Sequence, residues 1–133
     1  MLVRVLYISE VSPGVTALDI DRLVAHARRR NRQLDLTGAL LACDGHFAQV
    51  LEGHEVLLEE MMRKIAVDTR HRDLRVLERT VIRQRLFSDW DMAFVDESRC
   101  GDDFRNLLAG DLAPGGFMMA MGAWIEDYKT APF

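Results

Sequence analysis

Cysteine is scarce in this 133-residue chain: Cys43 and Cys100 are the only two, and they lie far apart. That spacing excludes a disulfide framework and a CxxC redox or zinc motif, and it indicates a reducing compartment. No apolar run approaches the roughly 20 residues of a membrane-spanning helix. The amino-terminal MLVRVLYIS is too short, and its apolar run begins too early, for a signal peptide. We therefore expect a cytoplasmic protein without a membrane partner.

Strong basic charge and the common catalytic motifs are also missing. The net charge is −4, whereas nucleic-acid-binding domains usually carry a marked basic patch, so no nucleic acid partner is expected. The one basic cluster, Arg28 to Arg30 and Arg32, falls where a helix should end and where cations oppose the helix dipole. The four histidines form no HxxxH or HExxH pair, and no GxSxG or glycine-rich phosphate loop occurs. The sequence thus predicts neither a metal site nor an enzyme.

Hydrophobic periodicity predicts the order strand, helix, two strands joined by a hairpin, helix, strand, strand. The expected ranges are strand 2–9, helix 17–31, hairpin 36–53, helix 55–67, strands 74–82 and 87–95, and helices 102–109 and 117–129. This order is that of a ferredoxin-like α+β fold, here a five-stranded mixed sheet with two helices on one face. Residues 1–96 would form this domain. Residues 97–133 would form a C-terminal helical extension that either packs on the sheet face of Leu6 and Ile8 or forms a partner or dimer surface.

The central hairpin places an amide in an apolar layer. Asp44-Gly45 is a strong hairpin signal, and alternation puts Phe47, Gln49 and Leu51 on one face of the second arm. An unpaired buried amide costs about 1–3 kcal/mol, so Gln49 should have a specific partner. Backbone groups and a bound ligand both remain open as that partner.

Two further neutral polar groups point toward the same apolar region. Asn31 continues the apolar stripe of the first helix, formed by Ile20, Leu23, Val24 and Ala27. It would either cap that helix or contact a ligand. Tyr7 lies near the end of the first strand, as an ordinary structural tyrosine or at a ligand site. Two amides and a phenol suit a planar, uncharged heterocycle better than a phosphate or a metal.

Other candidate residues have a plain structural alternative. Lys64 and Asp68 are four residues apart and suit a surface ion pair. Trp90, Met92 and Phe94 are expected to alternate onto one face of the last strand, where ordinary core packing would explain them.

Taken together, five segments resemble the BLUF domain, a blue-light sensor that uses flavin. These are LVRVLYIS with Tyr7, Asn31 shortly before DLTG, FAQVLEG with Gln49, DTRH from Asp68 to His71, and Trp90-Asp91-Met92. They cover roughly residues 2–96 in family order, and the combination is far more specific than any single motif. The remaining segment resembles the short helical extension of single-domain members without an enzymatic effector.

The resemblance implies a non-covalent flavin between the two helices, usually FAD, with FMN or riboflavin as alternatives. Asn31 would hold the polar edge of the ring, and Gln49 would bond both flavin and Tyr7. Blue light would drive electron and proton transfer from Tyr7 to the flavin and back. A rearranged or tautomerised Gln49 amide and a red-shifted absorbance would remain. Trp90 and Met92 would pass the change to the C-terminal helices and a downstream signalling protein.

The resemblance also assigns further residues to flavin contact. They are Lys64, Asp68, His71, Ile20, Val24 and Arg30. Arg30 departs from the commonest pattern, because many relatives carry a second amide at that position. A homodimer through the C-terminal or sheet surfaces is compatible with the sequence.

Two other function classes compete with the photoreceptor. One is a light-insensitive ligand-binding or oligomerisation module on a ferredoxin-like fold. The other is a small enzyme that uses Arg30 and Asn31 to hold an anionic acyl or phosphate group. Only the photoreceptor would purify as a yellow flavoprotein.

Overall fold

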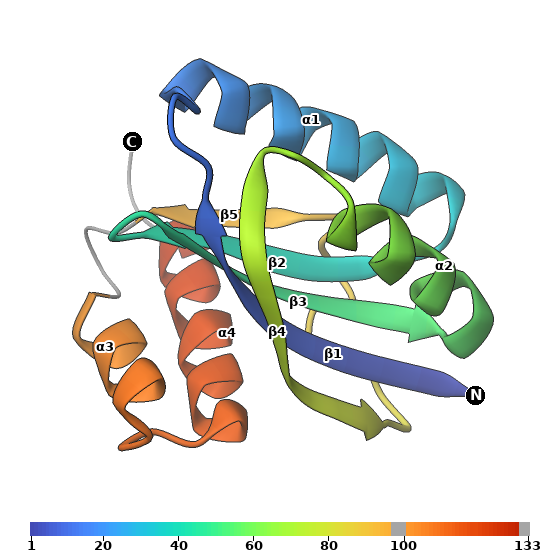
Figure 1. Cartoon of the computed structure of the whole chain (residues 1–133). Coiled ribbons are helices and arrows are strands. Elements are labelled where there is room, and N and C mark those ends of the chain that lie inside the picture. The colour runs from blue at the N-terminus through green and yellow to red at the C-terminus, as the bar shows by residue number, and fades with distance from the viewer. Residues whose placement is uncertain (97–100, 131–133) are drawn as a thin grey trace.

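The computed structural model describes residues 1–96 and 101–130, which form a five-stranded sheet between two pairs of helices (Figure 1). The strands are β1 (Leu2–Val11), β2 (Thr37–Cys43), β3 (His46–His54), β4 (His71–Val81) and β5 (Ala93–Asp96). The helices are α1 (Ala17–Gln33), α2 (Glu55–Ala66), α3 (Gly101–Ala109) and α4 (Pro114–Thr130). The strand order is β4-β1-β3-β2-β5, with β5 parallel to β2 and the other pairs antiparallel. The predicted ferredoxin-like α+β sheet is confirmed.

The alternation of β1 divides the core into two layers. Val3, Val5 and Tyr7 belong to the cluster under α1 and α2, whereas Leu6 and Ile8 belong to the cluster under α3 and α4. The second cluster includes four α4 side chains, Phe117, Met118, Met121 and Ile125. Both faces of the sheet are therefore covered, as the mainly apolar composition of both sides of β1 requires. No helix among the described residues is long and apolar enough to cross a bilayer.

Local sequence signals account for the hairpin and the start of α1. Asp44 and Gly45 both have positive φ, 51° and 75°, which the tight turn between β2 and β3 needs. Thr16 and Asp19 form a reciprocal capping box at the first turn of α1. The helix runs on to Gln33 with Leu34 as its C-cap, so Asn31 lies inside α1 and is not its cap.

The last strand is shorter than predicted, because most of 87–95 is irregular. Only Ala93–Asp96 pairs with β2, and residues 82–92 cross between the two edges of the sheet as a loop. At the start of this segment Glu52, a fully buried carboxylate on β3, accepts hydrogen bonds from Leu86 N at 2.7 Å and Phe87 N at 2.8 Å. Backbone amides that a strand would give to its neighbour are therefore bound by a side chain.

The expectation that Trp90, Met92 and Phe94 share one face is wrong for Trp90. Met92 and Phe94 pack in the cluster under α1 and α2, whereas Trp90 packs against the cluster under α3 and α4. The two-residue alternation holds only for extended strands, and the chain at positions 90–92 is a loop.

Glu52→Ala is expected to lower the free energy of unfolding by about 3–5 kcal/mol, because it removes one partner of a buried ion pair. Arg4 Nε lies 2.8 Å from the Glu52 carboxylate, and the Arg4 side chain is only 18% exposed. The matched control is Glu59→Ala, since Glu59 forms a largely exposed pair with Arg79, worth about 1 kcal/mol or less. Urea unfolding of both variants checks this, and similar losses would contradict it.

Candidate functional site

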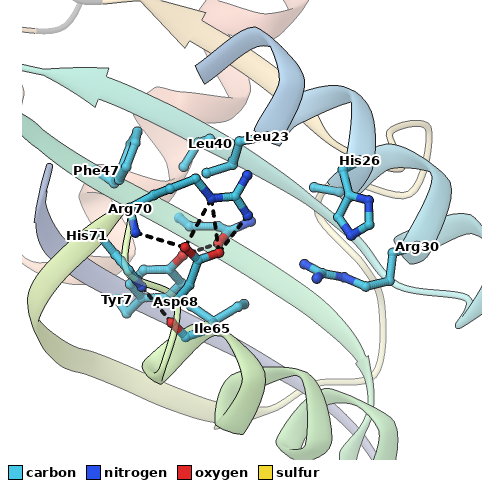
Figure 2. Close-up of a pocket in the computed structure, with 12 residues that line it drawn as sticks. Tyr7, Leu23, His26, Arg30, Leu40, Phe47, Ile65, Asp68, Arg70 and His71 are labelled. Atoms are coloured by element: carbon cyan, nitrogen blue, oxygen red, sulfur yellow. Dashed lines mark hydrogen bonds and ion pairs between the residues drawn. The ribbon is translucent and has the colours of Figure 1, made fainter. Parts of the chain in front are cut away.

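A pocket lies between α1, the facing side of the sheet and the segment that follows α2 (Figure 2). Its lining comprises Tyr7, Leu23, His26, Ala27, Arg30, Leu40, Phe47, Gln49, Ile65, Asp68, Arg70 and His71. Small-molecule sites typically combine apolar walls with a few convergent polar groups. The lining of this pocket has that composition.

Tyr7 and Gln49 meet at the sheet side of the pocket. They are direct partners in the register of β1 and β3, so their side chains leave the same face. The Tyr7 hydroxyl donates to Gln49 Oε1, and Gln49 Nε2 donates to Met92 Sδ at 3.5 Å. The expectation that buried Gln49 has a specific partner is confirmed, and both of its partners are side chains.

The Tyr7 hydroxyl keeps its proton in this setting and donates a hydrogen bond. Burial is the main reason that its pKa lies above the ordinary value, and the negative charge of Asp68 raises it further. The positive charge of Arg30 opposes these effects but does not cancel them. The phenol is therefore neutral and holds its proton toward Gln49 Oε1.

Charged side chains lie on two sides of the pocket, one side formed by the segment after α2 and the other by α1. Arg70 and Asp68 form an ion pair with Nη2 and Oδ2 2.6 Å apart, and this bond to Arg70 lowers the pKa of Asp68. Asp68 thus pairs with Arg70 rather than with Lys64, whose side chain is exposed. Arg30 and His26 project from α1 on the other side (Figure 2).

Arg30 has an unsatisfied donor. Its Nε is buried and has no hydrogen-bond partner among the described residues. Burial, followed by the like charge of Arg70, lowers the pKa of Arg30. A buried donor without an acceptor costs about 1–3 kcal/mol, so the pocket suits a ligand that brings an acceptor oxygen or nitrogen to this position.

His71 is fixed at the opposite wall. Its Nδ1 lies 2.7 Å from Ser9 Oγ and its Nε2 lies 2.6 Å from the carbonyl oxygen of Ile65. Its ring meets that of Tyr7 edge-on, with the centroids 6.2 Å apart. Both ring nitrogens are thus engaged with protein groups, and the ring serves as a rigid wall.

The structure brings only part of the predicted site together. Five of the predicted residues line the pocket, namely Tyr7, Gln49, Arg30, Asp68 and His71. Six do not, namely Asn31, Lys64, Ile20, Val24, Trp90 and Met92. Asn31 is buried, and its Nδ2 donates to the carbonyl oxygen of Asp91 at 2.8 Å. Ile20 and Val24 belong to the apolar cluster under α1 and α2.

Sequence reasoning missed several lining residues. Leu23 and Ala27 stood in the apolar stripe of α1 without being assigned to the site. His26 was also missed, although it lies four residues before Arg30, which was assigned to the site, and therefore shares a helix face with it. Arg70 stood inside the DTRH segment, but its pairing with Asp68 depends on the turn after α2.

Comparison with known proteins supports the resemblance to the BLUF domain. A family model described as sensors of blue light using FAD matches residues 2–93. The photoactivated adenylate cyclase subunit beta of Euglena longa is 33% identical over 97 residues, which are 72% of this chain and 11% of that protein. The blue light- and temperature-regulated antirepressor BluF of Escherichia coli is 39% identical over 71 residues, 53% of this chain and 18% of the relative. The chain therefore spans only about a tenth to a fifth of the length of these curated relatives.

Solved structures of BLUF proteins are similar to this chain over more of its length. The dark-state structure of BlrB, a BLUF protein, superposes with a TM-score of 0.84 at 30% identity, covering 92% of this chain and 96% of that one. The photo-activated state of BlsA gives a TM-score of 0.81 at 25% identity. Since the family model spans most of the sequence and the matched segment contains the Tyr7–Gln49 pair, the chain belongs to the BLUF family of blue-light sensors that use FAD.

Proposed function

We propose that the hydrogen bonds of Tyr7 and Gln49 are the ones that change when this blue-light sensor responds to light. The observation that carries the proposal is the row of side-chain contacts from Tyr7 through Gln49 to Met92, beside a pocket that Tyr7 and Gln49 both line. No charged group takes part in this row, so the Gln49 amide can turn over without ionisation.

The pocket residues fit the flavin. Arg30 offers its unpaired Nε to an acceptor on the bound group, and Asp68 and His71 form part of the opposite wall. Asn31, Lys64, Ile20 and Val24 are assigned to the same site on family resemblance. When bound, FAD supplies the absorption of blue light and reversible redox chemistry. FMN or riboflavin would present the same ring to Arg30.

Gln49 has two hydrogen-bonding ends, and its neighbours respond differently when the amide turns over. The Tyr7 hydroxyl both donates and accepts, so it can bond either the oxygen or the nitrogen of the amide. The Met92 thioether only accepts, so it bonds the amide nitrogen but not the oxygen. The orientation with Nε2 toward Met92 is therefore favoured, and the reversed or tautomerised amide lies modestly higher in energy. Such a gap suits a reversible switch.

Met92 connects this switch to the other side of the sheet. It directly precedes β5, whose Ala93 and Val95 pack in the cluster under α3 and α4, as does Trp90. We assign residues 1–96 to the sensor and residues 97–133 to an extension that passes the change to a downstream signalling protein in the cytoplasm. The extension would act by changing contacts, without catalysis of its own.

Gln49→Leu and Tyr7→Phe are each expected to retain flavin and lose the reversible red shift, because each removes one partner of the bond that rearranges. The measurement is the visible absorbance of purified protein in darkness and after blue light. Gln33→Leu is the control, since Gln33 is an exposed glutamine at the end of α1. A normal red shift in both test variants would refute the proposed switch.

Arg30→Leu is expected to weaken FAD binding about ten- to a hundredfold, because a hydrogen bond from a charged donor contributes about 1.5–3 kcal/mol and each 1.4 kcal/mol is tenfold in affinity. Quenching of FAD fluorescence on titration with apoprotein gives the dissociation constant. Arg29→Leu is the matched control, since Arg29 is the exposed neighbour on the same helix. Equal affinities in the two variants would show that Arg30 does not hold the flavin.

The red shift is expected to keep its full size up to about pH 10, where an ordinary tyrosine is half ionised. Burial raises the pKa of Tyr7, so the neutral form that donates to Gln49 persists in alkali instead of being lost with rising pH. Light-minus-dark spectra from about pH 7 to pH 10 check this. A shift that halves near pH 10 while the flavin stays bound would contradict it.

A further inference from the structure

Three residues of α1 hold the Asp91–Met92 segment, and we call them the α1 clamp: Arg28, Asn31 and Arg32. Arg28 Nε donates to the carbonyl oxygen of Met92 at 2.9 Å, and Asn31 Nδ2 donates to that of Asp91 at 2.8 Å. Arg32 Nε lies 3.0 Å from Asp91 Oδ2. Positions three and four apart share one face of a helix, so a single face of α1 makes all three contacts.

The three contacts of the α1 clamp fix different atoms. The Arg32–Asp91 pair is exposed, with Arg32 73% accessible, and such pairs contribute little. Asn31 is buried and binds the backbone one residue before Met92. Arg28 alone binds Met92 itself, through a charge-assisted hydrogen bond, which is roughly twice as strong as a neutral one.

Met92 is therefore held at its backbone and at the sulfur of its side chain. Its carbonyl oxygen accepts from Arg28, and its sulfur accepts from Gln49 Nε2 at 3.5 Å. A side chain reaches a fixed position only when its backbone is fixed, and the chain at Met92 is a loop without ladder hydrogen bonds of its own. The bond from Arg28 is the side-chain hydrogen bond that holds the Met92 backbone itself, and it therefore contributes to the position of the sulfur beside the amide.

We propose that Arg28 is a positioning residue for the light response, acting through the Met92 sulfur on the Gln49 amide. The inference rests on the proposed Gln49 switch. A fixed thioether favours the amide orientation that turns Nε2 toward it, because sulfur accepts a hydrogen bond and cannot donate one. Arg28 thereby stabilises the dark orientation and speeds the return to it. Without Arg28, Met92 discriminates less between the two orientations.

Arg28→Gln is expected to slow thermal recovery of the dark spectrum about three- to tenfold, the effect of losing part of one charge-assisted bond in the recovery step. Arg29→Gln is the matched control. Arg29 is the next residue of α1, is exposed, and makes no hydrogen bond or ion pair within the described part of the chain. Bound flavin per protein and urea unfolding in darkness show whether both variants keep the fold. Identical recovery in the two variants would overturn the inference.

A second pair of variants separates positioning from general support of the fold. If Arg28 acts through the sulfur, R28Q changes recovery strongly in the wild-type background and not in the Met92→Leu background. Equal slowing in both backgrounds would reduce Arg28 to a structural residue and refute the inference. If R28Q does not hold flavin, Arg28→Lys serves in the same two backgrounds, because an ammonium cannot reproduce the geometry of the guanidinium. About twofold slowing in the wild-type background alone is then expected.

The two proposals fail in distinguishable ways. A flavin-bound wild-type protein with no red shift would refute the Gln49 switch itself. A normal wild-type shift together with unchanged recovery in R28Q would refute only the role of Arg28.

Discussion

The arrangement of this sensor depends on one buried amide with unlike neighbours. Gln49 lies between a hydroxyl that can reverse its role and a thioether that cannot. The register of β1 and β3 sets the first neighbour, since Tyr7 and Gln49 are direct cross-strand partners. The second neighbour has no strand to place it. Contacts from other elements therefore have to hold the Met92 loop in position.

β2 takes part in that task through a glycine. The backbone N–H of Gly38 donates to the carbonyl oxygen of Trp90 at 3.1 Å, which joins the loop to the strand beside β3. A Cβ at position 38 would lie 2.0 Å from the carbonyl oxygen of Val50, closer than any side chain tolerates. Glycine thus lets β2 lie close against β3 at the point where it also binds the loop.

Local patterns in the sequence predicted what local physics decides. The two faces of β1, the Asp44-Gly45 turn, the Thr16 capping box and the buried face of Gln49 follow from periodicities of two and 3.6 and from turn chemistry. The path of residues 82–92 did not follow, because it depends on Glu52, which lies 34 and 35 residues before the amides it binds. The same limit applies to Asn31, whose partner Asp91 is 60 residues away. Its helical spacing correctly indicated burial and gave no indication of which group it would meet.

The loop from β4 to β5 is fixed at two points, and this explains how one segment can serve both faces of the sheet. Glu52 binds its backbone at Leu86 and Phe87 on the side of α3 and α4. The α1 clamp binds it at Asp91 and Met92 on the other side. Between these points the chain passes from one layer of the core to the other, so Trp90 packs in one cluster and Met92 in the other. In the proposed mechanism, a displacement of Met92 would therefore reach Trp90, and with it the cluster under the C-terminal helices, through the short backbone between them.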